Sequence, residues 1–354
     1  MGLRMIVHFT ATNICFNPFN HFSFGFTCSN SNKLLLSKTP SCGIRLKSTP
    51  LSLYLSFMAT NLHVSQSAPT HDFEATPSLQ IGQYDLLIVG PGILGRLVAH
   101  TWRQEYPGCQ VFGQTLTTDH HGELIEIGIS PSLNWTGGKH KFPYVIFCAP
   151  PYQSSDYNGY IRLAALSWNG EGSFLFTSSS APYDCNDNGS CDEDTPVVPI
   201  GRSRRTDVLL NAENIVLEFG GSVVRLSGLY ISFVEFNLLG FRRSNLSMLL
   251  FKGIVECRPD HILNLIHYED AASLSVAILK KKFGERIFLG CDNHPLSRQE
   301  IMDLVNQSGK LSKKFEKFIG TNDPLGKKLN NSRTRQEVGW EPKYSSFAHF
   351  LETL

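Results

Sequence analysis

The sequence predicts an α/β protein built on a doubly wound parallel sheet, with a small α/β lobe at its C-terminal end. Its 354 residues, 42% of them hydrophobic and 18% charged, are enough to bury a sizeable core. From Tyr84 onward, short apolar runs alternate with longer amphipathic stretches, which is the pattern of repeated strand–helix–strand units. A glycine-rich loop joins the first apolar run to the first amphipathic stretch.

The first strand is expected at 84–89, where apolar residues follow one another without alternation because helices cover both faces of such a sheet. Further strands are expected at 110–113, 143–149, 173–177 and 222–226, and helices at 93–106, around 123, at 160–168 and at 207–218. Beyond Tyr230 the pattern is less regular, with strands near 262–266 and 286–289 and helices near 268–280, 297–306 and 345–352.

Residues 90–95 read Gly-Pro-Gly-Ile-Leu-Gly and lie between a strand and a helix, as a dinucleotide-binding G-x-G-x-x-G loop requires. Gly90 permits the tight turn, Gly92 lets the backbone approach a pyrophosphate, and Gly95 lets the helix pack closely on the strand. The helix start presents unpaired N–H groups to the anion. The cofactor contacts expected from this loop are Gly90, Gly92, Ile93, Leu94 and Gly95.

The residue at the end of the second strand usually distinguishes NAD from NADP. An acid there binds the ribose hydroxyls of NAD, whereas a nearby Arg accepts the extra phosphate of NADP. This chain has Gln114 and Thr115 at that place, which are candidate ribose contacts but neither acidic nor basic. The missing acid favours NADP, with Arg96 as a source of positive charge, and Asp119 is the alternative NAD-type acid.

Several further motifs occur in one order along the chain. They are the strand 145–149 leading into Pro150-Pro151, Phe-Thr-Ser-Ser-Ser-Ala-Pro-Tyr at 176–183, Asp-Thr-Pro at 194–196, Arg-Leu-Ser-Gly-Leu-Tyr at 225–230, 264–270, and Gly-Trp-Glu-Pro at 339–342. With the glycine loop, they resemble the atypical extended short-chain dehydrogenase/reductases of the NAD-dependent epimerase/dehydratase type. The resemblance implies a Rossmann fold, NAD or NADP as cofactor, Ala149 and Pro150 as further cofactor contacts, and a small-molecule substrate.

In that family a Tyr-x-x-x-Lys pair transfers the proton, while a Ser or Thr holds the substrate oxygen. The resemblance places the serine at Ser179 or Ser180. Laid on 200–204, the Tyr and Lys positions hold Ile and Arg, and anchored on Ala212-Glu213 they hold Arg205 and Leu209. Neither register keeps the pair, so Tyr183 is the candidate substitute for the proton donor.

Two functions follow. The first is an oxidoreductase or epimerase acting on a nucleotide sugar or another small hydroxyl or carbonyl compound. The second, suggested by the missing Tyr and Lys, is a non-catalytic dinucleotide sensor or scaffold. The sequence identifies no substrate and leaves the oligomeric state open, with a homodimer as one option.

Net charge and cysteine usage argue against other classes of protein. Residues 1–71 contain five basic and no acidic residues, so the remaining 27 basic and 31 acidic residues give −4, which disfavours nucleic-acid binding. The sequence contains no run of 18 apolar residues, so no membrane-spanning helix is expected. The nine cysteines form no pair with zinc spacing, and no metal site is expected.

The sequence divides into a leader at 1–77, a dinucleotide-binding core at 78–230 and a substrate lobe at 231–354. The acid-free, Ser- and Thr-rich leader is typical of a chloroplast transit peptide, with Met58 as an alternative start for a cytosolic form. The other interpretation is a disordered tail or an overextended gene model. The segment 231–257 is apolar and lacks the turn residues that the family has at this place. It is either a lid over the pocket or translated non-coding sequence.

Overall fold

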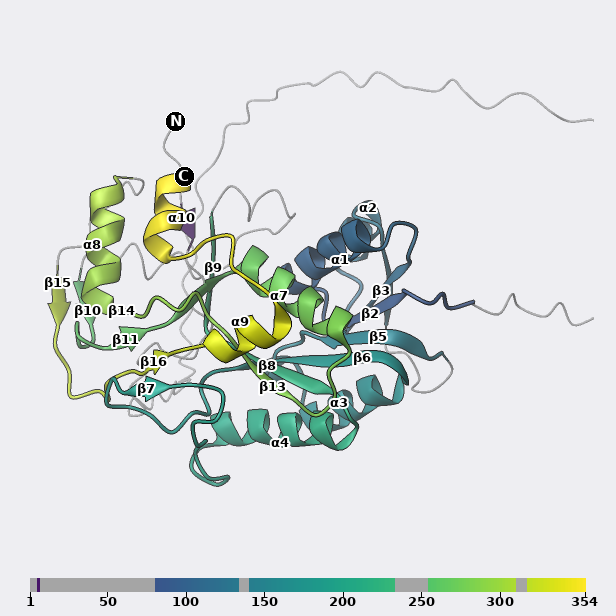
Figure 1. Ribbon diagram of the computed structural model, residues 1–354, viewed down its shortest axis with the longest axis horizontal. Helices are drawn as coiled ribbons and strands as arrows, with labels where there is room; N and C mark the ends of the chain where they lie inside the picture. Colours follow the sequence, from purple (N-terminus) through teal and green to yellow (C-terminus); the bar gives the residue numbers. More distant parts are fainter. Residues whose placement is uncertain (1–4, 7–79, 134–139, 233–253, 310–316) are drawn as a thin grey trace, which may run out of the picture. The chain divides into compact units, whose positions relative to one another are not determined.

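The computed structural model describes residues 5–6, 80–133, 140–232, 254–309 and 317–354. It contains a seven-stranded sheet in the order β13-β8-β6-β5-β2-β3-β4, in which every neighbouring pair is parallel (Figure 1). Its strands are β2 (Leu86–Val89), β3 (Val111–Thr115), β4 (Ile129–Leu133), β5 (Phe142–Phe147), β6 (Trp168–Ser179), β8 (Ser222–Leu226) and β13 (Ile287–Gly290). The predicted doubly wound α/β class is confirmed.

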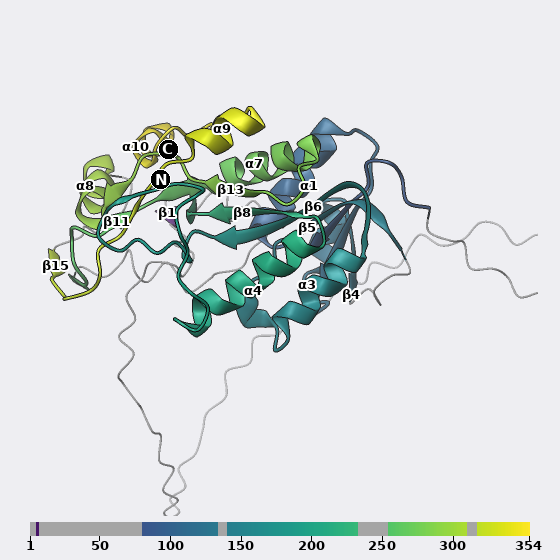
Figure 2. The same ribbon diagram turned by 60° about the horizontal axis from the view of Figure 1, so that its bottom comes forward.

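Helices cover both faces of this sheet. Figure 2 shows α1 (Ile93–Glu105) and α7 (Tyr268–Lys281) on one side, and α3 (Tyr157–Leu166) and α4 (Arg204–Glu218) on the other. Alternate residues of each strand enter opposite layers: Leu86 and Ile88 join the α1 side, whereas Leu87 and Val89 join the α3 side. All four residues of β2 are buried, which explains why its sequence shows no alternation.

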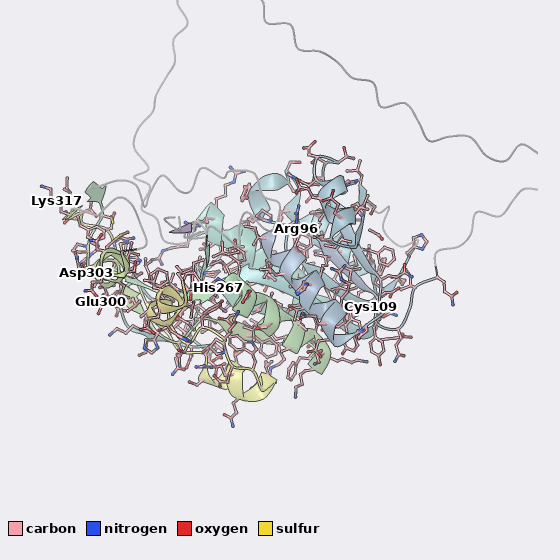
Figure 3. The ribbon with its side chains drawn as sticks, turned by 90° about the horizontal axis from the view of Figure 1, so that it is seen from above. Arg96, Cys109, His267, Glu300, Asp303 and Lys317 are labelled. Carbon is pink, nitrogen blue, oxygen red and sulfur yellow. The ribbon has the colours of Figure 1, made fainter. Side chains whose placement is uncertain are left out.

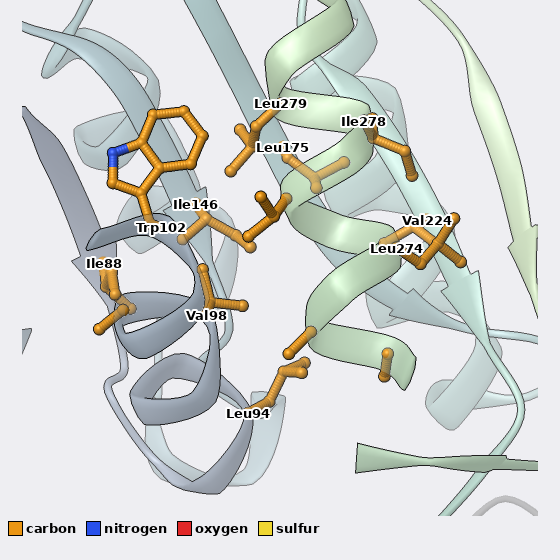
Figure 4. Packing of buried hydrophobic residues seen from close by; sticks show 14 of the residues in the cluster. Ile88, Leu94, Val98, Trp102, Ile146, Leu175, Val224, Leu274, Ile278 and Leu279 are labelled. Carbon is orange, nitrogen blue, oxygen red and sulfur yellow. The ribbon is translucent and has the colours of Figure 1, made fainter. Parts of the chain in front are cut away.

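The layer between the sheet, α1 and α7 is packed by aliphatic side chains around one large aromatic ring. Figure 4 shows Trp102 of α1 beside Ile146 of β5, with Leu274 of α7 over Val224 of β8. Trp102 is fully buried, and its ring nitrogen donates a hydrogen bond to the carbonyl of Tyr84 at 2.8 Å. The start of the first strand and the body of α1 are therefore joined by one side chain.

Apart from α7 and β13, which belong to the central sheet and its layers, the described chain beyond β8 forms short strands in small sheets and three helices. Its strands include β9 (Gly228–Ser232), which pairs with β12 (Leu265–His267) and with β1 (Met5–Ile6), and β11 (Ile262–Leu263), which pairs with β14 (Leu296–Ser297). The others are β7 (Ser190–Cys191) with β16 (Lys328–Leu329) and β10 (Ile254–Glu256) with β15 (Lys317–Ile319). The helices are α8 (Arg298–Ser308), α9 (Ser332–Val338) and α10 (Phe347–Thr353).

This lobe has an aromatic core of its own. Tyr230 meets Phe347 and Phe350 edge to face at ring-centroid distances of 5.2 and 5.0 Å. His267, which lies between α10 and α7 in Figure 3, packs its ring against Phe350 and Tyr344. The predicted small C-terminal α/β lobe is thus present, built on residues that the sequence places around Tyr230 and the last helix.

One strand of the central sheet was not predicted from the sequence, and two predicted segments lie wholly or partly outside the described residues. Strand β4 was not expected: it contains Pro131 and half-exposed residues, which an edge strand tolerates because its outer backbone needs no partner. The leader, including Met58, lies outside the described residues except for β1, and 231–257 is described only at its two ends. In the described part of the chain, no helix has the length and apolarity needed to cross a membrane.

Replacing a side chain in the α7 layer tests this packing. Leu274→Ala removes a fully buried side chain and should lower the free energy of unfolding by about 2–5 kcal/mol, measured by urea denaturation. Leu163→Ala, on the exposed face of α3, is the matched control and should change it by about 0.5 kcal/mol or less. Equal effects of the two variants would contradict the packing described.

Candidate functional site

The loops after β2 and β5 meet at the centre of the sheet. From β2 the chain continues outward through β3 and β4, and from β5 it continues the other way, so a crevice opens beyond the carboxyl ends of these two strands. The backbone N–H of Cys148 donates to the carbonyl of Val89 at 2.8 Å. A Cβ placed on Gly90 would lie 2.7 Å from Ala149, and Gly90 has φ +80°, so only glycine fits there.

The two other glycines of the loop behave differently. A Cβ on Gly95 would lie 2.9 Å from Cγ2 of Ile88, so α1 rests directly on β2 at this point. A Cβ on Gly92 would meet nothing within 4 Å. Gly92 is also the N-cap of α1, and neither a side-chain cap nor an acidic residue covers the first turn. The first-turn N–H groups therefore suit a phosphate group.

The end of β3 closes one side of the crevice. Gln114 is buried, and its carbonyl accepts a hydrogen bond from the N–H of Gly90 at 2.9 Å. The hydroxyl of Thr115 lies 2.7 Å from Nε2 of His121, the first residue of α2 (His121–Glu126). Asp119, the alternative acid, is exposed and accepts a hydrogen bond from the Thr117 hydroxyl. The sequence-predicted ribose contacts thus lie beside the glycine loop.

Arg96, expected as a source of charge for NADP, is only 2% exposed at its side chain and bonds Glu123 of α2 at 3.0 Å. His120 lies 3.4 Å from the same carboxylate oxygen. Burial works against ionisation of Glu123, but the hydrogen bonds from Arg96 and His120 outweigh it and hold the pKa of this carboxyl below its ordinary value. The positive charge of Arg96 is therefore already matched.

The serine run ends β6 at the same edge of the sheet, one strand beyond β5. Ser178 is buried, and its hydroxyl donates to Oε1 of Glu213 at 2.5 Å. Ser180 is also buried, and its N–H donates to the carbonyl of Leu226. Ser179 is half-buried, and its hydroxyl accepts a hydrogen bond from the N–H of Ala181 at 3.2 Å. Of the two predicted serines, Ser179 is therefore the more accessible to a substrate.

Glu213 of α4 is the centre of a buried ion pair that sequence reasoning did not foresee. Nη2 of Arg225 on β8 lies 2.7 Å from its Oε2, and Nε of Arg225 lies 3.2 Å from both carboxylate oxygens. The guanidinium of Arg225 in turn lies 4.7 Å from the ring centroid of Tyr183. This network ties α4, β6 and β8 together beneath the serine turn.

The structure shows where the two registers for the missing Tyr and Lys fall. Because Glu213 faces the sheet, the residues four and eight positions earlier, Leu209 and Arg205, lie on the same side of α4. Leu209 is buried and Arg205 is at the exposed start of the helix. In the other register, Ile200 is exposed and Arg204 begins α4 directly after its N-cap, Ser203. Leu209 thus occupies the place where the second register expects a lysine.

Tyr183, the candidate proton donor, is 2% exposed. It packs with Cys191, Leu289, Cys291 and Leu329. Burial raises its pKa to about 12, although Arg225 acts in the opposite direction. A general acid works best with a pKa near the working pH. The role of Tyr183 as proton donor stays a prediction, and its surroundings make proton release at neutral pH costly.

A lysine contacts the serine turn from a distant part of the chain. Nζ of Lys327 donates to the carbonyls of Tyr183 at 2.6 Å and Ser180 at 3.3 Å. Burial lowers its pKa, while nearby Cys191, Cys185 and Asp184 act in the opposite direction. Since 147 residues separate Lys327 from Ser180, no local motif could have indicated this contact.

The polar residues of the segment 264–270 serve the lobe. Asn264 donates to the carbonyl of Lys327 and accepts from the N–H of Leu329. His267 caps α7 by accepting from the N–H of Glu269, and Asp270 accepts from two backbone N–H groups at 343 and 344. The polar side chains of this segment therefore hold the lobe together through backbone groups of distant residues.

One buried carboxyl lies directly after β13. Asp292 is 2% exposed, and its Oδ1 accepts a hydrogen bond from the N–H of His294 at 2.9 Å. Burial raises its pKa to about 8, with the hydrogen bond from His294 opposing and Asp270 reinforcing this shift. The Asp292 carboxyl thus stays protonated well above the pH at which an exposed aspartate ionises.

Solved structures share this fold. A conserved protein of unknown function from Silicibacter pomeroyi is 21% identical, with a TM-score of 0.59 over 76% of this chain and 97% of that one. dTDP-glucose 4,6-dehydratase from Bacillus anthracis, solved with NAD, is 15% identical, with a TM-score of 0.58 over 76% and 94%. UDP-glucuronic acid 4-epimerase from Bacillus cereus, also with NAD, is 13% identical, with a TM-score of 0.57 over 76% and 96%.

No family model matches the sequence, and no curated protein matches it. At these identities the likeness establishes a shared fold: the central sheet and its helices have the arrangement found in epimerase and dehydratase structures.

The buried Asp292 carboxyl predicts a pH dependence of stability. The pKa of Asp292 is higher in the folded protein than in the unfolded chain. Its contribution to the free energy of unfolding is therefore fully present below the ordinary aspartate pKa of about 3.9 and is lost as pH rises toward 8. Asp292→Asn keeps an oxygen for the N–H of His294 and removes the titration. Between pH 5 and 7, wild-type stability relative to this variant should fall by up to about 1.4 kcal/mol per pH unit. Parallel pH profiles of urea denaturation would refute this.

Proposed function

We propose that this chain binds NAD or NADP in the crevice beyond β2 and β5, and acts as an epimerase- or oxidoreductase-type enzyme. The observation that carries this proposal is the glycine loop: Gly90 has no room for a side chain against Ala149, whereas Gly92 leaves open space in front of the first turn of α1. A pyrophosphate needs that combination of a tight turn and an uncovered helix start. The two bacterial enzymes described above, which share the fold, were solved with NAD.

The residues of the crevice fit a dinucleotide in order. The N–H groups at the start of α1 bind the phosphates, Gln114 and Thr115 face the adenosine ribose, and Ala149 and Pro150 border the other half. The nicotinamide ring, when bound, accepts and returns a hydride. The side chains of the chain itself bind and orient the substrate and exclude water.

Ser179 is the residue proposed to hold the substrate oxygen. Its hydroxyl lies at the end of β6. On one side of it, the Ser178 hydroxyl is hydrogen-bonded to Glu213. On the other side, Lys327 donates hydrogen bonds to the carbonyls of Ser180 and Tyr183. The turn is therefore held on both sides, which leaves the Ser179 hydroxyl in a defined place for a carbonyl or hydroxyl group of the substrate. We propose a nucleotide sugar or another small hydroxyl or carbonyl compound as that substrate.

Proton transfer is the weak step in this site. The pKa of Tyr183, raised by burial, leaves this residue a poor acid at neutral pH. General acid catalysis typically contributes about 100- to 10,000-fold, so turnover should be slow if no other group takes the role.

We also propose a chloroplast location, which is supported by the composition of residues 1–71 alone.

Gly92→Val tests the cofactor site. The backbone at Gly92 has φ −76° and open space around its Cβ position, so the variant should fold normally, while its side chain enters the space meant for the pyrophosphate. We expect NAD(H) and NADP(H) binding, measured by calorimetry, to weaken at least about tenfold. Gly320→Val, another glycine with open space, is the control and should bind like wild type. Unchanged affinity in Gly92→Val would refute the placement.

Ser179→Ala tests the catalytic assignment with UDP-glucose, UDP-glucuronic acid and dTDP-glucose as substrates. Loss of one hydrogen bond to the reacting oxygen should lower kcat/KM by roughly 10- to 100-fold and leave cofactor affinity unchanged. Ser345→Ala, at an exposed serine, is the control. Tyr183→Phe in the same assay reports whether the buried hydroxyl transfers the proton.

A wild-type rate that survives Ser179→Ala would show that another group holds the substrate. Tight cofactor binding without turnover on any carbonyl or hydroxyl compound would instead support the non-catalytic sensor.

A further inference from the structure

The corner of the crevice beside β3 contains an acid that the end of β3 lacks. Three segments meet there: the end of β3, the first turn of α1 and the short helix α2. Arg96 belongs to the first turn of α1, and Cys109, which follows the last turn of that helix, marks its other end in Figure 3. Glu123 of α2 bonds Arg96, and His121 of α2 lies against the Thr115 hydroxyl. The ribose side of the proposed site is thus bordered by α2.

The contacts of Glu123 leave its carboxylate available to a ligand. The hydrogen bond from Arg96 and the ion pair with His120 both end on Oε2, at 3.0 and 3.4 Å. The side chain of Glu123 is 33% exposed, whereas that of Arg96 is 2% exposed. Arg96 therefore lies beneath the carboxylate and orients it, and a ligand entering the corner meets the carboxylate before it meets the guanidinium.

This order of charges disfavours an extra phosphate. A phosphate on the adenosine ribose carries nearly two negative charges, and it would have to approach an ionised carboxylate that already satisfies the nearby arginine. Ribose hydroxyls have the opposite requirement, because they donate hydrogen bonds to a carboxylate. The Thr115 hydroxyl, 2.7 Å from His121, adds a second polar group beside the same space.

We propose that Glu123, carried by α2 and oriented by Arg96, accepts the ribose hydroxyls of the adenosine half and makes this chain select NAD over NADP. The inference rests on the proposed dinucleotide site and adds its cofactor selectivity. It reverses the preference for NADP that the missing acid at Gln114 and Thr115 suggested. Arg96 acts here as a positioning residue, and Glu123 is the residue that touches the cofactor.

The test is calorimetric titration of the full chain with NAD⁺ and with NADP⁺. Wild type should bind NAD⁺ at least about tenfold more tightly. Glu123→Gln keeps the size of the side chain and an oxygen for Arg96, but removes the charge. We expect NAD⁺ affinity to fall about tenfold, NADP⁺ affinity to rise, and the ratio of the two to move by at least about tenfold. Thermal unfolding checks that the variant is folded.

Glu126→Gln, at an exposed acid of the same helix, is the matched control and should leave the ratio unchanged. A wild-type preference for NADP⁺, or an unchanged ratio in Glu123→Gln while both cofactors bind, would overturn this inference and leave the proposed function standing. Failure of wild type to bind either cofactor would overturn both.

Discussion

The close approach of two loops at the centre of the sheet decides where this molecule can hold a ligand. Gly90 has no space for a side chain because the backbone of Ala149 occupies it, and the N–H of Cys148 bonds the end of β2 directly. The same turn brings the N–H of Gly90 onto the carbonyl of Gln114. Three strand ends are therefore joined by backbone contacts, and the start of α1 is directed over them. Every candidate cofactor contact depends on this junction.

A second constraint lies beneath the serine turn. Burying a carboxylate and a guanidinium costs desolvation energy that only complete hydrogen bonding offsets. Glu213 meets this condition, since it accepts from Ser178 and from two nitrogens of Arg225. The result is a rigid base formed by α4, β6 and β8. The family resemblance leads one to look along α4 for a reactive pair, but the buried polar group on this helix, Glu213, bonds inward to the sheet.

The parts of the site that could be predicted from the sequence are formed by residues that lie close together along the chain. The glycine loop and its flanking strand and helix could be predicted because turn, close packing and helix start all leave marks within 84–106. The pairing of Glu213 with Arg225 and of Arg96 with Glu123 joins separate elements, so neither residue alone indicates its partner. Tyr183 lies in a recognisable motif, yet three of the residues that bury it, Leu289, Cys291 and Leu329, are more than a hundred positions away. Strand β4 escaped prediction because Pro131 and its half-exposed neighbours mark an edge.

Lys327 has a consequence for the order in which the site forms during folding. The glycine-loop contacts described above all lie within 84–149, so the residues that make them are present once the chain extends past Ala149. The carbonyls of Ser180 and Tyr183 gain their ammonium partner only when a residue 147 positions after Ser180 arrives. Contacts of such long range close late, because the intervening chain must first lose its conformational freedom. A ribosome-bound chain that ends before this lysine would thus already contain the glycine loop, while the carbonyls of its serine turn would still lack their ammonium partner.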